Sequence, residues 1–193
     1  ATPLGKRVAE LYLDPLSADS LIQTLKKEKL STFGALYGLV NTTEFRPYVN
    51  VGKKNEAELW EQFQARSPEL SVNAEEAMFA DMQVLEKFLS ARFLESWIGE
   101  VTEQQLVDEF NIQPGIIRSK LKIVDWLAYS AVELAPFATK TPPTATLNKL
   151  RKRLQSGISE ELILLCELRG IGRVRARRMF NVGVKNVSDV KNI

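Results

Sequence analysis

The residues best suited to chemistry in this 193-residue sequence are arginines, clustered in the stretch LRGIGRVRARRMF at 168–180. Five arginines fall in the ten positions from Arg169 to Arg178, with no acidic residue among them. So concentrated a positive charge points to a polyanionic partner, most simply a nucleic acid. A basic helix that only keeps the protein in solution is the plain alternative.

The local pattern favours phosphate binding. Two short helices joined by the turn at 170–172 form a predicted helix-hairpin-helix, in which Gly170 and Gly172 can adopt positive φ. The backbone N–H groups of the turn and of the next helix are then open to a phosphate. Arg173 and Arg177 stand four apart on one face of that helix. The predicted DNA contacts of the hairpin are Gly170, Gly172, Arg173, Arg175, Arg177 and Arg178, and such a device does not read base sequence.

The charge of the chain is unevenly distributed, and its net value does not reveal the basic C-terminal segment. Its formal net charge is only +2, but residues 144–193 hold 11 Lys and Arg against 4 Asp and Glu. The remaining 143 residues hold 15 basic and 20 acidic side chains. A basic module next to an acidic body is again what a polyanion-binding protein shows.

A second candidate site lies on the most regular predicted helix, from Pro114 to Leu134. On a helical wheel one arc is apolar, and Trp126 falls instead on the polar stripe, above Lys122 and Arg118. An aromatic platform between cations suits single-stranded nucleic acid, with stacking for a base and charge for the backbone. The alternative is that Trp126 packs against a neighbouring helix, as Trp60 and Trp97 are assumed to do. Lys120, near the middle of the apolar arc, has no sequence-level explanation.

Several absences bound the chemistry. The chain has no histidine and one cysteine, so the usual neutral-pH acid–base group is missing and no disulfide framework is possible. No phosphate-binding loop or dinucleotide fingerprint occurs, and no carboxylates are spaced like a metal site. No apolar run is long enough to span a membrane. We therefore expect no catalytic residue, no metal site and no membrane segment.

The elements that position these residues are predicted to be helices throughout, so the fold class is all-α. A helical bundle is expected at about 1–140 and a helix-hairpin-helix domain at about 144–193, separated by the linker PFATKTPPTAT at 136–146. Both ends of the chain suggest a fragment of something longer. The predicted helices are Gly5–Leu13, Ser17–Lys29, Ser31–Asn41, Asn55–Ala65, Asn73–Trp97, Thr102–Phe110, Pro114–Leu134, Leu147–Gln155, Ser159–Leu168 and Gly172–Asn181.

Three segments in order, TPLGKRVAELYLDP, NIQPGIIRSKLKIVDWL and ELILLCELRGIGRVRARRMFNVGVKNVSDV, resemble the C-terminal third of the archaeal Hjm-type DNA helicases. These are superfamily-two repair helicases related to animal HELQ. The resemblance implies a helical ratchet domain followed by a helix-hairpin-helix domain that lacks its second half.

The resemblance also implies roles for residues. The ratchet helix of the family places a tryptophan, here Trp126, and an arginine against bases of the translocating strand. That arginine falls on Ser119, so Arg118 on the same stripe is the expected substitute. The segment from Arg173 to Arg177 matches the residues with which the family holds single-stranded DNA behind the ratchet helix. The expected contacts of the ratchet helix are Trp126, Arg118, Ser119, Lys122 and Tyr129.

The function implied is a single-stranded DNA-binding module of an ATP-dependent 3′-to-5′ helicase of fork repair and recombination. No cofactor is expected in this chain, because ATP and Mg²⁺ belong to the motor domains of the parent protein. Expected partners are single-stranded or forked DNA, the motor and winged-helix domains of the same polypeptide, and fork-repair proteins, in the cytoplasm at the nucleoid. The alternatives are a structure-specific hairpin module that recruits a nuclease, the ratchet module of an RNA helicase, and a protein-interaction domain with an incidental basic tail.

Overall fold

The computed structural model describes residues 2–70 and 72–190, and every regular element in those ranges is a helix. The predicted all-α class is confirmed. The α-helices are α1 (Pro3–Glu10), α2 (Pro15–Leu25), α3 (Thr32–Val40), α4 (Glu56–Leu70), α5 (Ala74–Ala80), α6 (Val84–Ile98), α7 (Glu103–Phe110), α8 (Pro114–Ala138), α9 (Thr144–Ser156), α10 (Ile163–Cys166), α11 (Arg173–Asn181) and α12 (Val187–Val190), with 3-10 turns at Lys53–Asn55 and Glu160–Leu162. None of these helices is long and apolar enough to cross a lipid bilayer.

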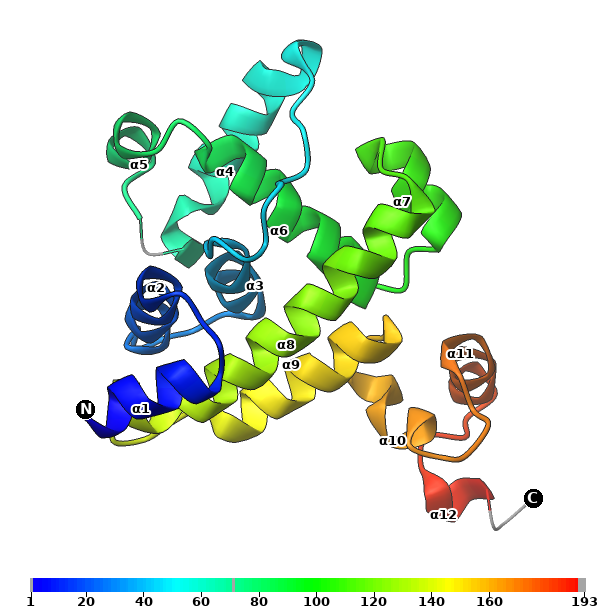
Figure 1. Cartoon of the computed structure of the whole chain (residues 1–193). Coiled ribbons are helices and arrows are strands. Elements are labelled where there is room, and N and C mark those ends of the chain that lie inside the picture. The colour runs from blue at the N-terminus through cyan, green and yellow to red at the C-terminus, as the bar shows by residue number, and fades with distance from the viewer. Residues whose placement is uncertain (1, 71, 191–193) are drawn as a thin grey trace.

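Helix α8 is the axis of the bundle. It crosses the molecule diagonally, with α9 along one side and α1, α2 and α3 along others, while α4, α5 and α6 stack beyond α3 (Figure 1). One side of α8 is buried throughout its length, from Ile117 through Val124 and Leu127 to Leu134. This burial fixes the rotation of α8 about its axis and so decides which residues it presents to solvent.

The predicted start of α8 is confirmed, whereas its predicted end at Leu134 is wrong. Pro114 occupies the first turn, where its missing N–H has no partner to lose. Pro136, the first residue of the predicted linker, lies inside the helix, and α8 continues to Ala138. A proline so near the end interrupts little of the hydrogen-bond ladder, and packing against α9 stabilises the last turn.

Lys120 is buried, 5% exposed, and has a structural explanation. Its ammonium donates hydrogen bonds to the carbonyl oxygens of Phe45 and Pro47 and lies 4.6 Å from the centre of the Phe45 ring. Burial lowers the pKa of Lys120 to about 8. The buried side chain thus uses its ammonium to hold the loop at 45–47 against α8.

Other predicted boundaries shift for local reasons. The single helix predicted from Asn73 to Trp97 is wrong, because α5 ends at Ala80 and the Asp81 carboxylate accepts the Gln83 N–H at 2.9 Å before α6 begins. Asp14 caps α2. Thr102, a residue type that favours the position before a helix, caps α7 in a complete capping box with Gln105.

Two separate hydrophobic cores follow each other along the chain. The main core extends from α1 through α9, and Leu147, Leu150 and Leu154 of α9 lie in it, although the sequence-based boundary assigned residues from 144 onward to the hairpin domain. The second core is small and draws its buried side chains only from residues between Ile158 and Val184. Of the linker predicted at 136–146, residues 139–143 are not helical.

Candidate nucleic-acid interface

The polar stripe of α8, which we define as Arg118, Ser119, Lys122, Trp126 and Tyr129, lies along one side of a single helix. Ser119 and Trp126 are two helical turns apart and therefore share a face, with Lys122 between them. Arg118, Ser119, Lys122 and Tyr129 are exposed, and Trp126 is half-buried. All five predicted residues of this helix are thus on one connected surface.

Trp126 is held in place from outside its own helix. Its indole Nε1 donates a hydrogen bond of 3.1 Å to the carbonyl oxygen of Leu11, the residue that ends α1. One part of the ring packs against the main core. The indole is thus anchored at its nitrogen and packed on one side, and it remains partly open to solvent on the other.

The two ends of the stripe differ in how free their side chains are. Arg118 is 74% exposed in its side chain and lies 3.5 Å from Glu103, an ion pair too exposed to contribute much stability. Tyr129 is 37% exposed, and the guanidinium of Arg151 lies 5.1 Å from the centre of its ring. Arg151 in turn is bound to Asp125 at 2.8 Å, so α9 covers one side of Tyr129.

The arginine hairpin, residues 163–181, contains the other predicted contacts. Gly170 has φ +80, and a β-carbon placed there or at Gly172 would meet no other atom within 4 Å, so the turn is open to solvent. Gly172 itself is extended, with φ −90, and begins α11 without a side-chain cap. Ile171 packs on the second core. The first N–H groups of α11 are consequently available to an anion.

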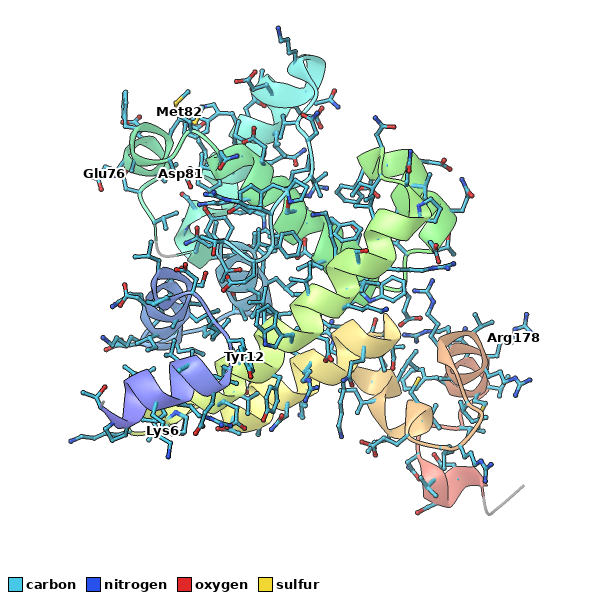
Figure 2. The ribbon with its side chains drawn as sticks, viewed as in Figure 1. Lys6, Tyr12, Glu76, Asp81, Met82 and Arg178 are labelled. Atoms are coloured by element: carbon cyan, nitrogen blue, oxygen red, sulfur yellow. The ribbon has the colours of Figure 1, made fainter. Side chains whose placement is uncertain are left out.

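The four predicted arginines of α11 divide into two pairs. Arg173 and Arg177 face the bundle: Arg173 donates to the carbonyl oxygens of Val101 and Gly157 at 3.2 and 3.3 Å, over the ring of Trp97. Arg175 and Arg178 are exposed. Arg178 projects from the side of α11 that faces away from the bundle (Figure 2).

Arg177 makes the strongest contact between the hairpin and the bundle. Its guanidinium binds both carboxylate oxygens of Glu100, at 2.8 and 2.5 Å, and also Glu161 at 2.7 Å. Glu100 follows the end of α6 with φ +70, a conformation that residues with side chains rarely adopt. Sequence reasoning missed Glu100 because it lies 77 positions from Arg177 and belongs to no motif.

The Glu100–Arg177 contact predicts a pH dependence. Hydrogen bonds from Arg177 lower the pKa of Glu100 from 4.5 to about 2. Because the folded-state pKa is the lower one, the contact stabilises fully above about pH 4.5 and this contribution is lost as the pH falls toward 2. Glu100→Gln should reduce the free energy of unfolding at pH 7 by about 1–2 kcal/mol, less than the full shift implies because solvent screens part of the pair.

Urea unfolding of the wild type and Glu100→Gln between pH 7 and pH 2.5 checks this expectation. The two curves of stability against pH should converge at the acid end. Glu167→Gln is the matched control, because Glu167 pairs with Lys152 on the surface with both side chains about half exposed. A Glu100→Gln deficit that stays constant down to pH 2.5 would contradict the assignment.

The sequence of this chain is similar to a known protein family and to several known proteins. Residues 33–157 match the family described as archaeal helicase, domain 4. The chain is 34% identical over 192 residues to the ATP-dependent DNA helicase Hel308 of Methanocaldococcus jannaschii, covering 99% of this chain and 15% of that protein. It is 34% identical over 195 residues to Hel308 of Pyrococcus horikoshii, covering 100% of this chain and 27% of that protein.

Hel308 of Methanococcus vannielii is 33% identical over 202 residues, covering 98% of this chain and 25% of that protein. The chain thus spans between 15% and 27% of the length of these relatives. The family resemblance inferred from the sequence is confirmed. This chain, with its helical bundle and arginine hairpin, belongs to the archaeal DNA helicases and contains their domain 4.

Proposed function

We propose that the chain binds single-stranded DNA as the C-terminal module of an ATP-dependent helicase that unwinds DNA 3′ to 5′ in fork repair and recombination. The bundle is the ratchet domain, and the arginine hairpin lies in a helix-hairpin-helix domain whose core begins at Ile158. ATP hydrolysis with Mg²⁺ belongs to motor domains of the parent polypeptide, which acts in the cytoplasm on DNA of the nucleoid. The relatives named as ATP-dependent DNA helicases support this role.

One observation carries the proposal: Trp126 lies on an exposed, partly cationic stripe and is anchored by its nitrogen to Leu11. An anchored indole loses little conformational freedom when a base stacks on it, and Lys122 one turn away supplies charge for a phosphate. The stripe therefore offers the two features that a single strand needs. The exposed pair Arg175 and Arg178, with the open N-terminus of α11, holds phosphates further along the strand.

A fluorescence anisotropy titration of the 193-residue chain tests the function. Labelled single-stranded DNA, duplex DNA and RNA of equal length are compared at 50 and 200 mM salt. We expect single-stranded DNA to bind most tightly and its affinity to fall with salt. Preference for duplex or junction DNA would instead indicate a structure-specific hairpin module. Equal or tighter binding of RNA would indicate the ratchet module of an RNA helicase. Weak binding that does not depend on salt would indicate a protein-interaction domain.

A further inference from the structure

The end of α1 has a conformation that its sequence does not favour. The Tyr12 N–H bonds to the Ala9 carbonyl at 3.1 Å, and the Leu13 N–H bonds to the Val8 carbonyl at 3.3 Å. This is the Schellman arrangement, whose left-handed residue is usually glycine. Here that residue is Tyr12, with φ +56, so a β-carbon is forced into a region that it normally avoids.

Packing does not compensate for this strain. The Tyr12 side chain is 88% exposed, so little of its surface is buried against the bundle. Glu100 is a useful comparison, because it occupies the same position after α6, with φ +70, and uses it to aim its carboxylate at Arg177. Tyr12 has the same left-handed backbone, but its ring is left open to solvent.

The location of Tyr12 indicates the class of ligand. The preceding residue, Leu11, accepts the hydrogen bond from Trp126. Tyr12 therefore directly follows the residue that anchors the indole. Figure 2 shows Tyr12 beside α8, where the chain leaves α1. An exposed aromatic side chain that follows α1 and a half-buried one on α8 are thus linked through Leu11.

The surrounding charges indicate which part of a nucleotide Tyr12 contacts. The Asp14 N–H bonds to the Glu44 carboxylate at 2.9 Å, and the Asp14 carboxylate caps α2, so two carboxylates meet at Asp14, two positions after Tyr12. They repel a phosphate but not the π-face of a base. A strand at this point would therefore turn its bases toward the protein.

We propose that Tyr12 is a second base-stacking residue of the single-stranded DNA path, beside Trp126. The proposal rests on the proposed function. The left-handed backbone holds the ring away from the bundle, and the Trp126–Leu11 hydrogen bond fixes its distance from α8. One base stacks on Tyr12 and a neighbouring base on Trp126, which keeps the strand in register across the junction between α1 and α8.

Tyr12→Gly separates binding from stability, because the two should change in opposite directions. Glycine adopts φ +56 without strain, so the melting temperature should stay constant or rise by a few degrees. Loss of the ring should weaken binding of single-stranded DNA about tenfold at unchanged salt dependence. Tyr12→Phe keeps the π-face and should bind within about twofold of the wild type.

Two further variants of the 193-residue chain make the result decisive. Phe79→Ala is the matched control, since Phe79 is an aromatic side chain 92% exposed on α5, and its loss should leave affinity unchanged. Trp126→Ala reports on the proposed function itself. If Trp126→Ala weakens binding and Tyr12→Gly does not, the proposal for Tyr12 is overturned, the proposed function stands, and the exposed ring faces another protein domain. If the wild type fails to bind single-stranded DNA, both are overturned.

Discussion

Replacement of Trp126 by alanine is expected to weaken the binding of single-stranded DNA by about one to two orders of magnitude. Stacking of a base on an aromatic side chain contributes about 1–3 kcal/mol, and every base has a π-face, so the loss should depend little on sequence. The slope of log Kd against log salt should not change, because no charge is removed. Anisotropy titrations at several salt concentrations measure both quantities.

The structure adds a control that this experiment needs. Trp126 is half-buried and its nitrogen holds Leu11, so the alanine variant should also lose stability. Trp60 on α4 is likewise half-buried against the main core but lies away from the polar stripe. Trp60→Ala should lower the melting temperature without lowering the affinity of the folded protein. Equal affinities for Trp60→Ala and Trp126→Ala would contradict base stacking, and Trp126→Phe should retain part of the wild-type affinity.

The second large effect is expected from the exposed arginines of the hairpin. Each phosphate neutralised on a single strand contributes about −0.7 to the slope of log K, the binding constant, against log salt concentration. The double variant Arg175→Ala and Arg178→Ala should therefore flatten that slope by about 1.4. Its melting temperature should stay close to that of the wild type, because both side chains are exposed and the 2.9 Å hydrogen bond from Arg175 to the Gly170 carbonyl lies at the surface. An unchanged slope would mean that this side of α11 does not touch DNA.

The inward pair provides the comparison. Arg173→Ala with Arg177→Ala removes the hydrogen bonds to Glu100, Val101 and Gly157, so this double variant should lose stability. Any flattening of its salt slope should be smaller, since these guanidiniums are already paired with protein groups and neutralise fewer phosphates, so that fewer counterions leave the DNA. Thermal melting and salt titration of the two double variants, side by side, distinguish arginines that bind DNA from arginines that dock the hairpin.

What the sequence predicted well was local. Pro114 at the start of α8, the Thr102 capping box and the positive φ of Gly170 each depend on residues within a few positions. The polar stripe followed from helical periodicity alone, and its five residues do share one surface.

What the sequence could not predict depends on distant contacts. Nothing near Arg177 indicates that Glu100 is its partner, and nothing near Lys120 indicates the carbonyls of Phe45 and Pro47. The division of the α11 arginines into an inward and an outward pair needs the position of the bundle. Tyr12 carried a weak local signal, since no glycine follows α1 where a helix end with this geometry usually has one.

The division into two cores has a consequence for how the chain folds. The buried side chains of the main core range from Leu11 to Leu154, so most of its closure requires ends that are far apart in sequence, a slow process entropically. The buried side chains of the second core come from fewer than thirty consecutive positions between Ile158 and Val184 and can meet over short loops. During synthesis the main core therefore lacks Leu147, Leu150 and Leu154 until α9 has left the ribosome, whereas the second core needs only its own consecutive residues.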